Sequence, residues 1–188
     1  MALGNSASHW GSLSKFIHWT IAICILVAMF TAILNNQLLD DGGWQRALAT
    51  ELINVHRSCG ITALFLGVVR IIWIVWQGRP ALPTNINDVD RRYAVRSHKL
   101  IYILAIVVPL TGWLTTAAFG SKFQWFYLFD VVNPIDKNRD IVPYFYHAHW
   151  ILYHMLLVLV VLHVGAALWH HYSQRDNVLK RMLPGNKQ

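Results

Sequence analysis

Four of the histidines in the long apolar runs of this 188-residue sequence are candidates for function: His18, His56, His149 and His163. A histidine surrounded by hydrocarbon must have its ring nitrogens satisfied, so an ionisable side chain at membrane depth is a candidate for function. His149 and His163 lie in the same run and are 14 residues apart, which corresponds to about four turns and about 21 Å of α-helix. A helix in this run would therefore present two imidazoles on one face at two depths.

The apolar runs that contain these histidines are long enough to cross a bilayer, which takes about 20 mostly apolar residues. There are four such runs, at residues 16–34, 53–76, 100–119 and 144–169, and 55% of the chain is hydrophobic while 13% is charged. Because lipid offers no hydrogen-bond partner to a free backbone, each run is predicted to be a helix. The connections, at residues 35–52, 77–99 and 120–143, are turn-rich and leave no room for a second domain. We therefore predict an all-α membrane protein, with residues 1–188 forming a single domain built as a four-transmembrane-helix bundle.

The distribution of cations predicts the orientation of these helices. Eleven of the 16 lysines and arginines flank the N-terminus, the second connection and the C-terminal tail. Since positively charged flanks stay on the cytoplasmic side, both termini are predicted to be cytoplasmic. The cations stand at the ends of apolar runs and form no basic block, despite the formal net charge of +7, so no nucleic-acid binding is expected.

The predicted orientation sorts the four histidines into two pairs. His18 and His163 lie near the cytoplasmic ends of their runs, whereas His56 and His149 lie near the periplasmic ends. Imidazole binds zinc, copper, iron and nickel, but a zinc site usually takes three or four protein ligands. Two facing histidines suit the axial positions of a six-coordinate haem, and the sequence has no C-x-x-C-H motif for covalent attachment. Two non-covalent b-type haems that transfer electrons are therefore predicted, with copper or zinc binding as the alternative.

The cytoplasmic pair has one competitor. His98 opens the third apolar run at the same level and is an alternative to His163 as the partner of His18. The spacing between His149 and His163, which share a face of one helix, favours His163.

Three further side chains are candidates for binding roles. Arg70 follows His56 by 14 residues on the same predicted helix, and Arg57 is adjacent to His56. Each guanidinium would either bind a haem propionate or reach out to the lipid headgroups. His170 follows His163 by seven residues where the helix leaves the membrane. It would either contact headgroups or handle protons beside a cytoplasmic redox site.

Five stretches occur in order along the chain: FIHW, INVHRSCG, GVVRIIW, HKLIYILAIVVPLTGW and LHVGAALWHHYSQRDNVLKRMLPG. Together they resemble the prokaryotic cytochrome b561 family over residues 12–185. Members of this family are four-helix dihaem cytochromes of the bacterial inner membrane. The resemblance implies haem ligands in the first, second and fourth helices, at His18, His56, His149 and His163, and a quinone-associated histidine at His170.

The resemblance also implies a function. The characterised type of this family takes one electron from superoxide on the periplasmic side and passes electrons through two haems to ubiquinone. Such proteins have also been regarded as quinol-linked cytochromes that work in the opposite direction. The chain is thus expected to be a superoxide:ubiquinone oxidoreductase or a non-enzymatic electron carrier.

Other classes of function remain open. Residues 120–143 differ in character from the shorter loops expected in this family, which makes a periplasmic redox protein that docks there an alternative donor. In that case the chain would be a haem-bearing subunit of a larger system. A metal transporter would place carboxylates in the spans, and a simple membrane anchor would need no histidine layers.

Overall fold

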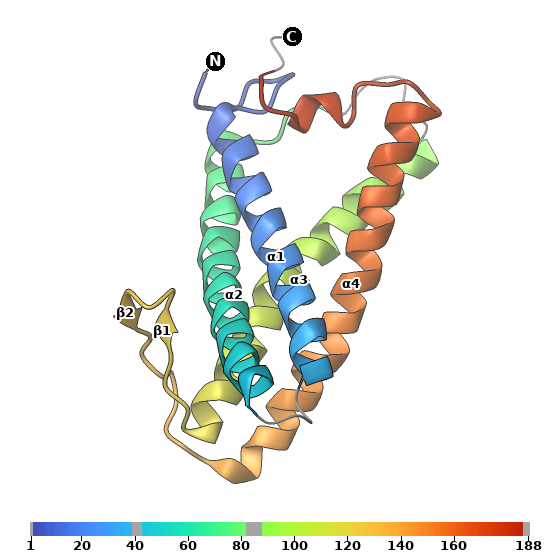
Figure 1. The fold of residues 1–188 in the computed structure, drawn as a ribbon. Helices are drawn as coiled ribbons and strands as arrows, with labels where there is room; N and C mark the ends of the chain where they lie inside the picture. The colour runs from blue at the N-terminus through green and yellow to red at the C-terminus, as the bar shows by residue number, and fades with distance from the viewer. Residues whose placement is uncertain (1, 39–42, 82–87, 186–188) are drawn as a thin grey trace.

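Four long helices make up most of the molecule: α1 (Ser12–Leu38), α2 (Trp44–Gln77), α3 (Asp88–Phe119) and α4 (Val142–Tyr172). Figure 1 shows their arrangement in a computed structural model, which describes residues 2–38, 43–81 and 88–185. All four helices are long and apolar enough to cross a membrane. The predicted all-α membrane architecture with four spans is thereby confirmed.

The helices extend beyond the apolar runs that predict them. The prediction of connecting turns is wrong for residues 35–38, 44–52 and 88–99, which are helical. Outside the lipid a helix continues through polar residues because each added residue brings its own backbone hydrogen bond. Acidic side chains in the first turn of α3 also favour its start at Asp88. His98 therefore lies well inside α3 and does not open it. Lys187, which contributes to the predicted orientation, lies outside the described residues.

The helices pack as two neighbouring pairs, α1 with α2 and α3 with α4, and α2 also contacts α3. Both termini lie at the same end of the bundle (Figure 1), which we call the inner end. The opposite end, where α1 and α3 finish, is called the outer end. Helix α3 runs through Pro109, whose missing N–H leaves the carbonyl of Ala105 without its helical partner.

A row of residues at seven-residue intervals runs along one face of α4: His149, Leu156, His163 and His170. Seven residues are nearly two helical turns, so residues at this spacing share a face. Leu156 is 2% exposed and forms an apolar cluster with three buried residues of α1 and α3: Met29, Leu104 and Val108. A packed hydrocarbon layer therefore separates the outer histidine level from the inner one.

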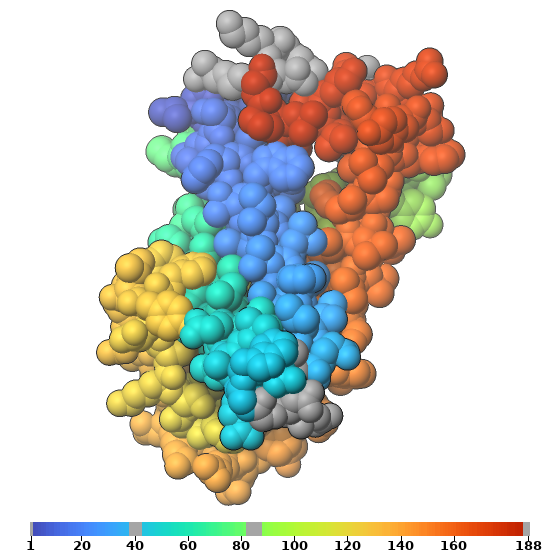
Figure 2. Space-filling model, in the orientation of Figure 1, coloured from blue at the N-terminus to red at the C-terminus, as the bar shows by residue number. Residues whose placement is uncertain are grey.

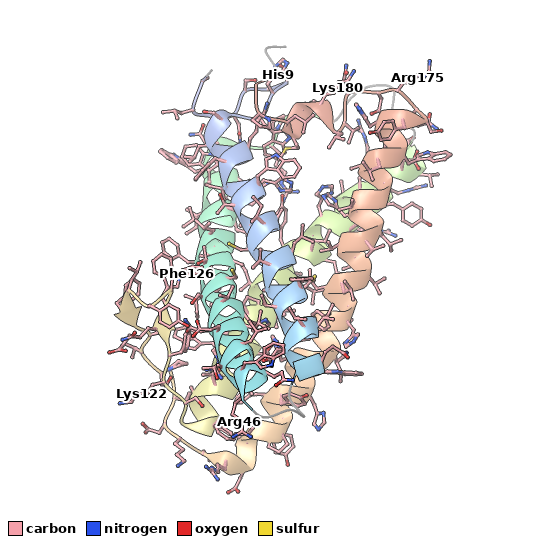
Figure 3. All side chains as sticks on the ribbon, in the orientation of Figure 1. His9, Arg46, Lys122, Phe126, Arg175 and Lys180 are labelled. Atoms are coloured by element: carbon pink, nitrogen blue, oxygen red, sulfur yellow. The ribbon has the colours of Figure 1, made fainter. Side chains whose placement is uncertain are left out.

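The connection between α3 and α4 contains a short antiparallel hairpin of β1 (Gln124–Trp125) and β2 (Phe129–Asp130), followed by the 3-10 turn η1 (Arg139–Ile141). The hairpin lies beside α2, and Figure 3 shows Phe126 at its tip and Lys122 nearer the outer end. The segment is turn-rich as predicted, but strands of two residues leave no alternating pattern that would predict a hairpin.

Two hydroxyl groups of α2 hold the tip of this hairpin. Ser58 Oγ, which is completely buried, accepts a hydrogen bond of 2.9 Å from the backbone N–H of Phe126. Trp125 Nε1 donates to Thr62 Oγ1 at 2.9 Å. Phe126 and Tyr127 have φ values of 44° and 62°, a left-handed conformation that costs a residue with a side chain about 1–2 kcal/mol. The bonds to α2 help to offset this cost.

The C-terminal segment folds back over the inner end and includes the 3-10 turn η2 (Lys180–Met182). Its backbone carbonyls accept hydrogen bonds from Lys15 Nζ and Trp19 Nε1 of α1, at 3.0 and 2.8 Å. Figure 2 shows a hollow between α1 and α4 beneath this segment. The C-terminal segment therefore covers the inner end of the space between these two helices.

Candidate functional site

The structure brings His56 of α2 and His149 of α4 together in the outer half of the bundle. Their ring centroids are 6.1 Å apart and their ring planes are inclined by 88°. His56 Nδ1 donates to the carbonyl oxygen of Ala28 on α1 at 2.9 Å. His149 Nδ1 donates to the carbonyl oxygen of Val108 on α3 at 2.8 Å. Since a carbonyl only accepts, each Nδ1 carries the proton and each Nε2 keeps its lone pair.

The spacing of these two rings fits a metal ion bound between them. A metal–nitrogen bond of about 2 Å on each side, plus about 1 Å from each nitrogen to its ring centre, separates two axial imidazoles by about 6 Å. The observed 6.1 Å between His56 and His149 meets this requirement. Donation from Nδ1 to a backbone carbonyl is also how proteins fix the tautomer and orientation of a ligating histidine.

Two cavities flank the same pair, one of about 270 Å³ toward the outer end and one of about 50 Å³ toward the middle of the bundle. Both are lined by His56, His149, Gly60 and Pro109. A flat group between the two rings would extend into both cavities. Among the described residues that line the larger cavity, Arg57 carries a permanent charge and no carboxylate is present. The site therefore fits a planar group with anionic substituents.

Gly112 of α3 makes room for the His149 ring. A Cβ atom at Gly112 would lie 2.9 Å from Cε1 and 3.1 Å from Nδ1 of His149. The imidazole would have to move, and the move would disturb its bond to Val108 and its 3.4 Å contact with Thr111 Oγ1. The absence of a side chain at this position is thus part of the site.

A second group of histidines lies in the inner half of the bundle. The ring centroids of His18 on α1 and His163 on α4 are 6.4 Å apart, with ring planes inclined by 72°. This spacing also fits a metal ion between two imidazoles. Among the described residues, no hydrogen bond holds either ring. The inner pair is therefore less firmly oriented by the protein than the outer pair.

His98 of α3, the alternative partner in the inner half, lies against the ring of His163. His98 and His163 have ring centroids 5.2 Å apart, about 1 Å less than two imidazoles on one metal ion require. His98 Nδ1 contacts the carbonyl oxygen of Ala94 in its own helix at 2.5 Å. This arrangement favours His18 over His98 as the partner of His163.

Arg70 of α2 lies at the level of the inner histidines, beside the turn of α1 that precedes His18. It is 5% exposed, and Nη1 donates to the carbonyl of Ser14 at 2.7 Å. Its Nε is buried and has no hydrogen-bond partner among the described residues. A buried donor without a partner is rare in proteins. A haem propionate would satisfy this N–H, and the burial of Arg70 disfavours the alternative in which it reaches the headgroups.

Arg57 occupies the corresponding place in the outer half. It lines the larger cavity with His56 and His149. Its guanidinium carbon lies 5.8 Å from the ring centre of Phe123, near the base of the hairpin. The structure thus places one arginine at each histidine level.

His170 has a partner that the sequence pattern did not reveal. Its Nδ1 lies 2.6 Å from Oδ2 of Asp176, in the turn that follows α4. The two residues are six apart, which is not the spacing of neighbours on a helix face. Only a chain reversal after His170 brings the carboxylate back to the ring.

The alternative of a zinc site with three or four protein ligands finds no support in the side-chain arrangement. Across residues 2–38, 43–81 and 88–185, no group of three or more His, Cys, Asp or Glu side chains is placed to hold a metal ion. The histidines instead form facing pairs, which suit a metal whose other ligands come from a macrocycle.

Four membrane-spanning helices with facing histidines at two depths are the architecture of a membrane-embedded b-type cytochrome. The family model of the prokaryotic cytochrome b561 matches residues 9–185, and the chain belongs to this family. Members bind b-type haem and transfer electrons in the membrane. The chain is thus a multi-pass bacterial membrane protein.

Three relatives match most of the chain. Cytochrome b561 homolog 2 of Escherichia coli (strain K12) is 28% identical over 183 residues, which cover 97% of this chain and 95% of the relative. A protein named probable superoxide oxidase CybB, from Yersinia pestis, is 29% identical over 168 residues, covering 89% and 92%. Cytochrome b561 homolog 1 of Escherichia coli (strain K12) is 27% identical over 174 residues, covering 92% and 95%. The similarity therefore includes all four helices.

Proposed function

We propose that this protein carries electrons across the bacterial inner membrane between superoxide, a periplasmic one-electron donor, and ubiquinone in the membrane. Two b-type haems would serve as the carriers, one held by His56 and His149 and the other by His18 and His163. The observation that carries this proposal is the pair of facing imidazoles at each of two levels, with centroid distances of 6.1 and 6.4 Å. The levels are about 21 Å apart along α4, so together they connect the two membrane surfaces.

The protein orients the imidazoles, places an arginine at each histidine level and excludes water from the space between the two levels. Haem, when bound, would supply one-electron redox chemistry. The carbonyl groups of Ala28 and Val108 keep the outer imidazoles in the tautomer that leaves Nε2 free. Arg57 and Arg70 would hold the propionates of the outer and inner haem, respectively. The apolar layer around Leu156 keeps water from the space between the levels.

Superoxide is the proposed donor for two reasons. One relative, from Yersinia pestis, is named a probable superoxide oxidase. The outer end also exposes the cations Lys122, Lys137 and Arg139, which attract an anion. This assignment places the outer end in the periplasm and both termini in the cytoplasm, in agreement with the distribution of cations along the chain.

A second donor is favoured by the connection between α3 and α4. Residues 122–139, which include the hairpin, expose charges of both signs, including Lys122, Asp130, Lys137 and Arg139. A periplasmic redox protein with complementary charges would dock there. The chain would then be a quinol-linked or haem-bearing electron-transfer subunit and would not oxidise superoxide itself.

The optical absorption spectrum of the purified protein, with the number of haems per chain, tests the cofactor assignment. We expect the reduced spectrum of b-type haem at two haems per chain. His149→Ala should remove the outer haem and His163→Ala the inner one, each leaving the other in place. A protein without b-haem bands, or one in which neither substitution removes a haem, would contradict the proposal.

Stopped-flow spectroscopy tests the donor and the acceptor. Superoxide should reduce the oxidised haems, and added ubiquinone should then reoxidise them. If superoxide leaves the haems oxidised while quinol reduces them, the second candidate function is the correct one.

A further inference from the structure

The chain reverses direction directly after α4. Ser173 and Gln174 both donate their backbone N–H to the carbonyl of Trp169, at 2.9 and 3.2 Å. Arg175 then adopts a φ of 52°, a left-handed conformation that is costly for a residue with a side chain. The N–H of Asp176 donates to the carbonyl of His170 at 3.1 Å. A strained backbone residue of this kind persists only where surrounding contacts fix it, and such residues often mark functional sites.

The reversal buries Asp176 against His170. The Asp176 side chain is 6% exposed and that of His170 is 21% exposed. Oδ2 of Asp176 lies 2.6 Å from His170 Nδ1, and Oδ1 accepts a hydrogen bond of 2.9 Å from the N–H of Val178. With Oδ1 bonded to Val178, Oδ2 is the oxygen that faces Nδ1, and a carboxylate oxygen there accepts the Nδ1–H of the ring. This contact selects the Nδ1–H tautomer, which leaves Nε2 as the nitrogen that exchanges protons.

We propose that Asp176 is a positioning residue that holds His170 in the Nδ1–H tautomer, so that Nε2 exchanges a proton with the quinone. This inference rests on the proposed function, with ubiquinone as the acceptor, and places the reaction at His170, which shares a face of α4 with His163 and lies about two turns nearer the inner end. Reduction of a quinone to a quinol consumes two electrons, which arrive from the haems one at a time, and two protons. The doubly protonated His170 gives its Nε2 proton to one quinone oxygen and is reprotonated from cytoplasmic water. The second proton comes from water, and quinol oxidation follows the same path in reverse.

The alternative role for Asp176 is to stabilise the turn alone, through its bond to Val178. The two roles differ in what Asp176→Asn does. An asparagine keeps an oxygen for the N–H of Val178, but it presents an NH₂ group to His170. Nδ1 would then have to accept, so the proton would move to Nε2 and the tautomer would invert.

Nitrogen-15 NMR of histidine-labelled protein, reduced so that the haems are diamagnetic, measures this tautomer directly. We expect the protonated nitrogen of His170 to be Nδ1 in the wild type and Nε2 in Asp176→Asn. Arg175→Gly is the matched control, because glycine adopts the positive φ without strain and leaves the carboxylate in place. Its tautomer should be that of the wild type. An unchanged tautomer in Asp176→Asn would overturn the proposal.

The rate of haem reoxidation by ubiquinone supplies the second readout. Asp176→Asn and His170→Gln should each lower this rate by on the order of 100-fold, the usual contribution of a positioned acid or base. The double variant should be no slower than His170→Gln, because Asp176 acts through His170. Asp176→Glu should recover part of the rate.

The outcomes separate this inference from the proposed function. If wild-type haems are not reoxidised by ubiquinone, the proposed acceptor is wrong, and the tautomer measurement alone decides whether Asp176 sets the ring. If the wild type reacts with ubiquinone but Asp176→Asn reacts equally fast, the positioning role is refuted. The positioning role would also be refuted if the effects of Asp176→Asn and His170→Gln on the reoxidation rate were fully additive in the double variant.

Discussion

The Nδ1 nitrogen of His149 on α4 lies 2.8 Å from the carbonyl oxygen of Val108 on α3. Helix α3 thus orients a candidate ligand although it contributes none to the outer pair. Pro109 follows Val108 and lines both cavities beside the ring, and Gly112 lies one turn further on, against the imidazole. This face of α3 is therefore part of the outer site.

Gly112→Ala should displace the outer haem. The added Cβ would lie 2.9 Å from His149 Cε1, and relieving such crowding in a packed interior costs about 1–3 kcal/mol. Since the imidazole must leave Val108, we expect b-haem absorbance per chain to fall by about half, as one of two sites is lost. Gly165→Ala on α4 is the control, because nothing lies within 4 Å of a Cβ there. Retention of both haems by Gly112→Ala would show that the site tolerates the shift.

His18→Ala should remove the inner haem, whereas His98→Ala should retain it. The reason is the ring spacing, which is 6.4 Å from His163 to His18 but 5.2 Å from His163 to His98. Haem content after purification, measured as the pyridine haemochrome, distinguishes the two variants. The reverse result would make His98 the ligand and would shift the inner haem toward α3.

Arg70→Gln should lower the midpoint potential of the inner haem. A nearby cation favours the reduced iron, which carries one positive charge less, so its removal favours oxidation. We expect a decrease of about 60 mV, which is a tenfold change in the redox equilibrium for one electron. Potentiometric titration measures the shift.

The matched control for this substitution is Arg79→Gln. Arg79 lies over the same Tyr102 ring, at 5.6 Å against 5.8 Å for Arg70, but it is exposed to solvent. Water screens its charge, so the potential should not change. Equal shifts in both variants would mean that Arg70 acts as part of a general surface field.

The tip of the hairpin should loosen at alkaline pH. The pKa of Tyr127 is raised above its ordinary value, chiefly because its hydroxyl donates a hydrogen bond to the carboxylate of Glu51. The folded state thus favours the neutral phenol. This contribution to stability is complete below the ordinary tyrosine pKa of about 10 and is lost as the pH rises through the raised pKa.

Tyrosinate absorbance measures this titration as the difference between the wild type and Tyr127→Phe. The midpoint should lie above the ordinary tyrosine value, and Glu51→Gln should bring it down. A midpoint at or below the ordinary value in the wild type would mean that the pair does not form in the membrane.

The four helices could be predicted from the sequence because hydropathy is a local property of the chain. A run of about 20 apolar residues that must satisfy its own backbone in lipid has one solution, a helix. The residues at which the helices begin and end were harder to predict. Residues 44–52 and 88–99 mix charged and apolar side chains and fall outside the apolar runs, yet they form the first turns of α2 and α3.

The sequence also predicted which histidines lie close together. Helical spacing sets relative depth, so His18 is level with His163 and His56 with His149, and the ring distances agree. Depth alone did not exclude His98, which lies beside His163 as well. The choice between His18 and His98 needs the positions of three helices, which depend on packing.

The sequence by itself therefore determined the class of protein, its four spans and the levels at which its histidines lie. Only the tertiary structure decided that the carbonyls of Ala28 and Val108 fix the two outer rings. It also decided that the Arg70 side chain is buried and that Asp176 contacts His170. The physical reason is the range of the forces involved. Hydrophobic burial and helix periodicity act along a continuous segment, whereas a contact at 2.6 Å between residues in a helix and the following turn depends on the φ of one residue, Arg175.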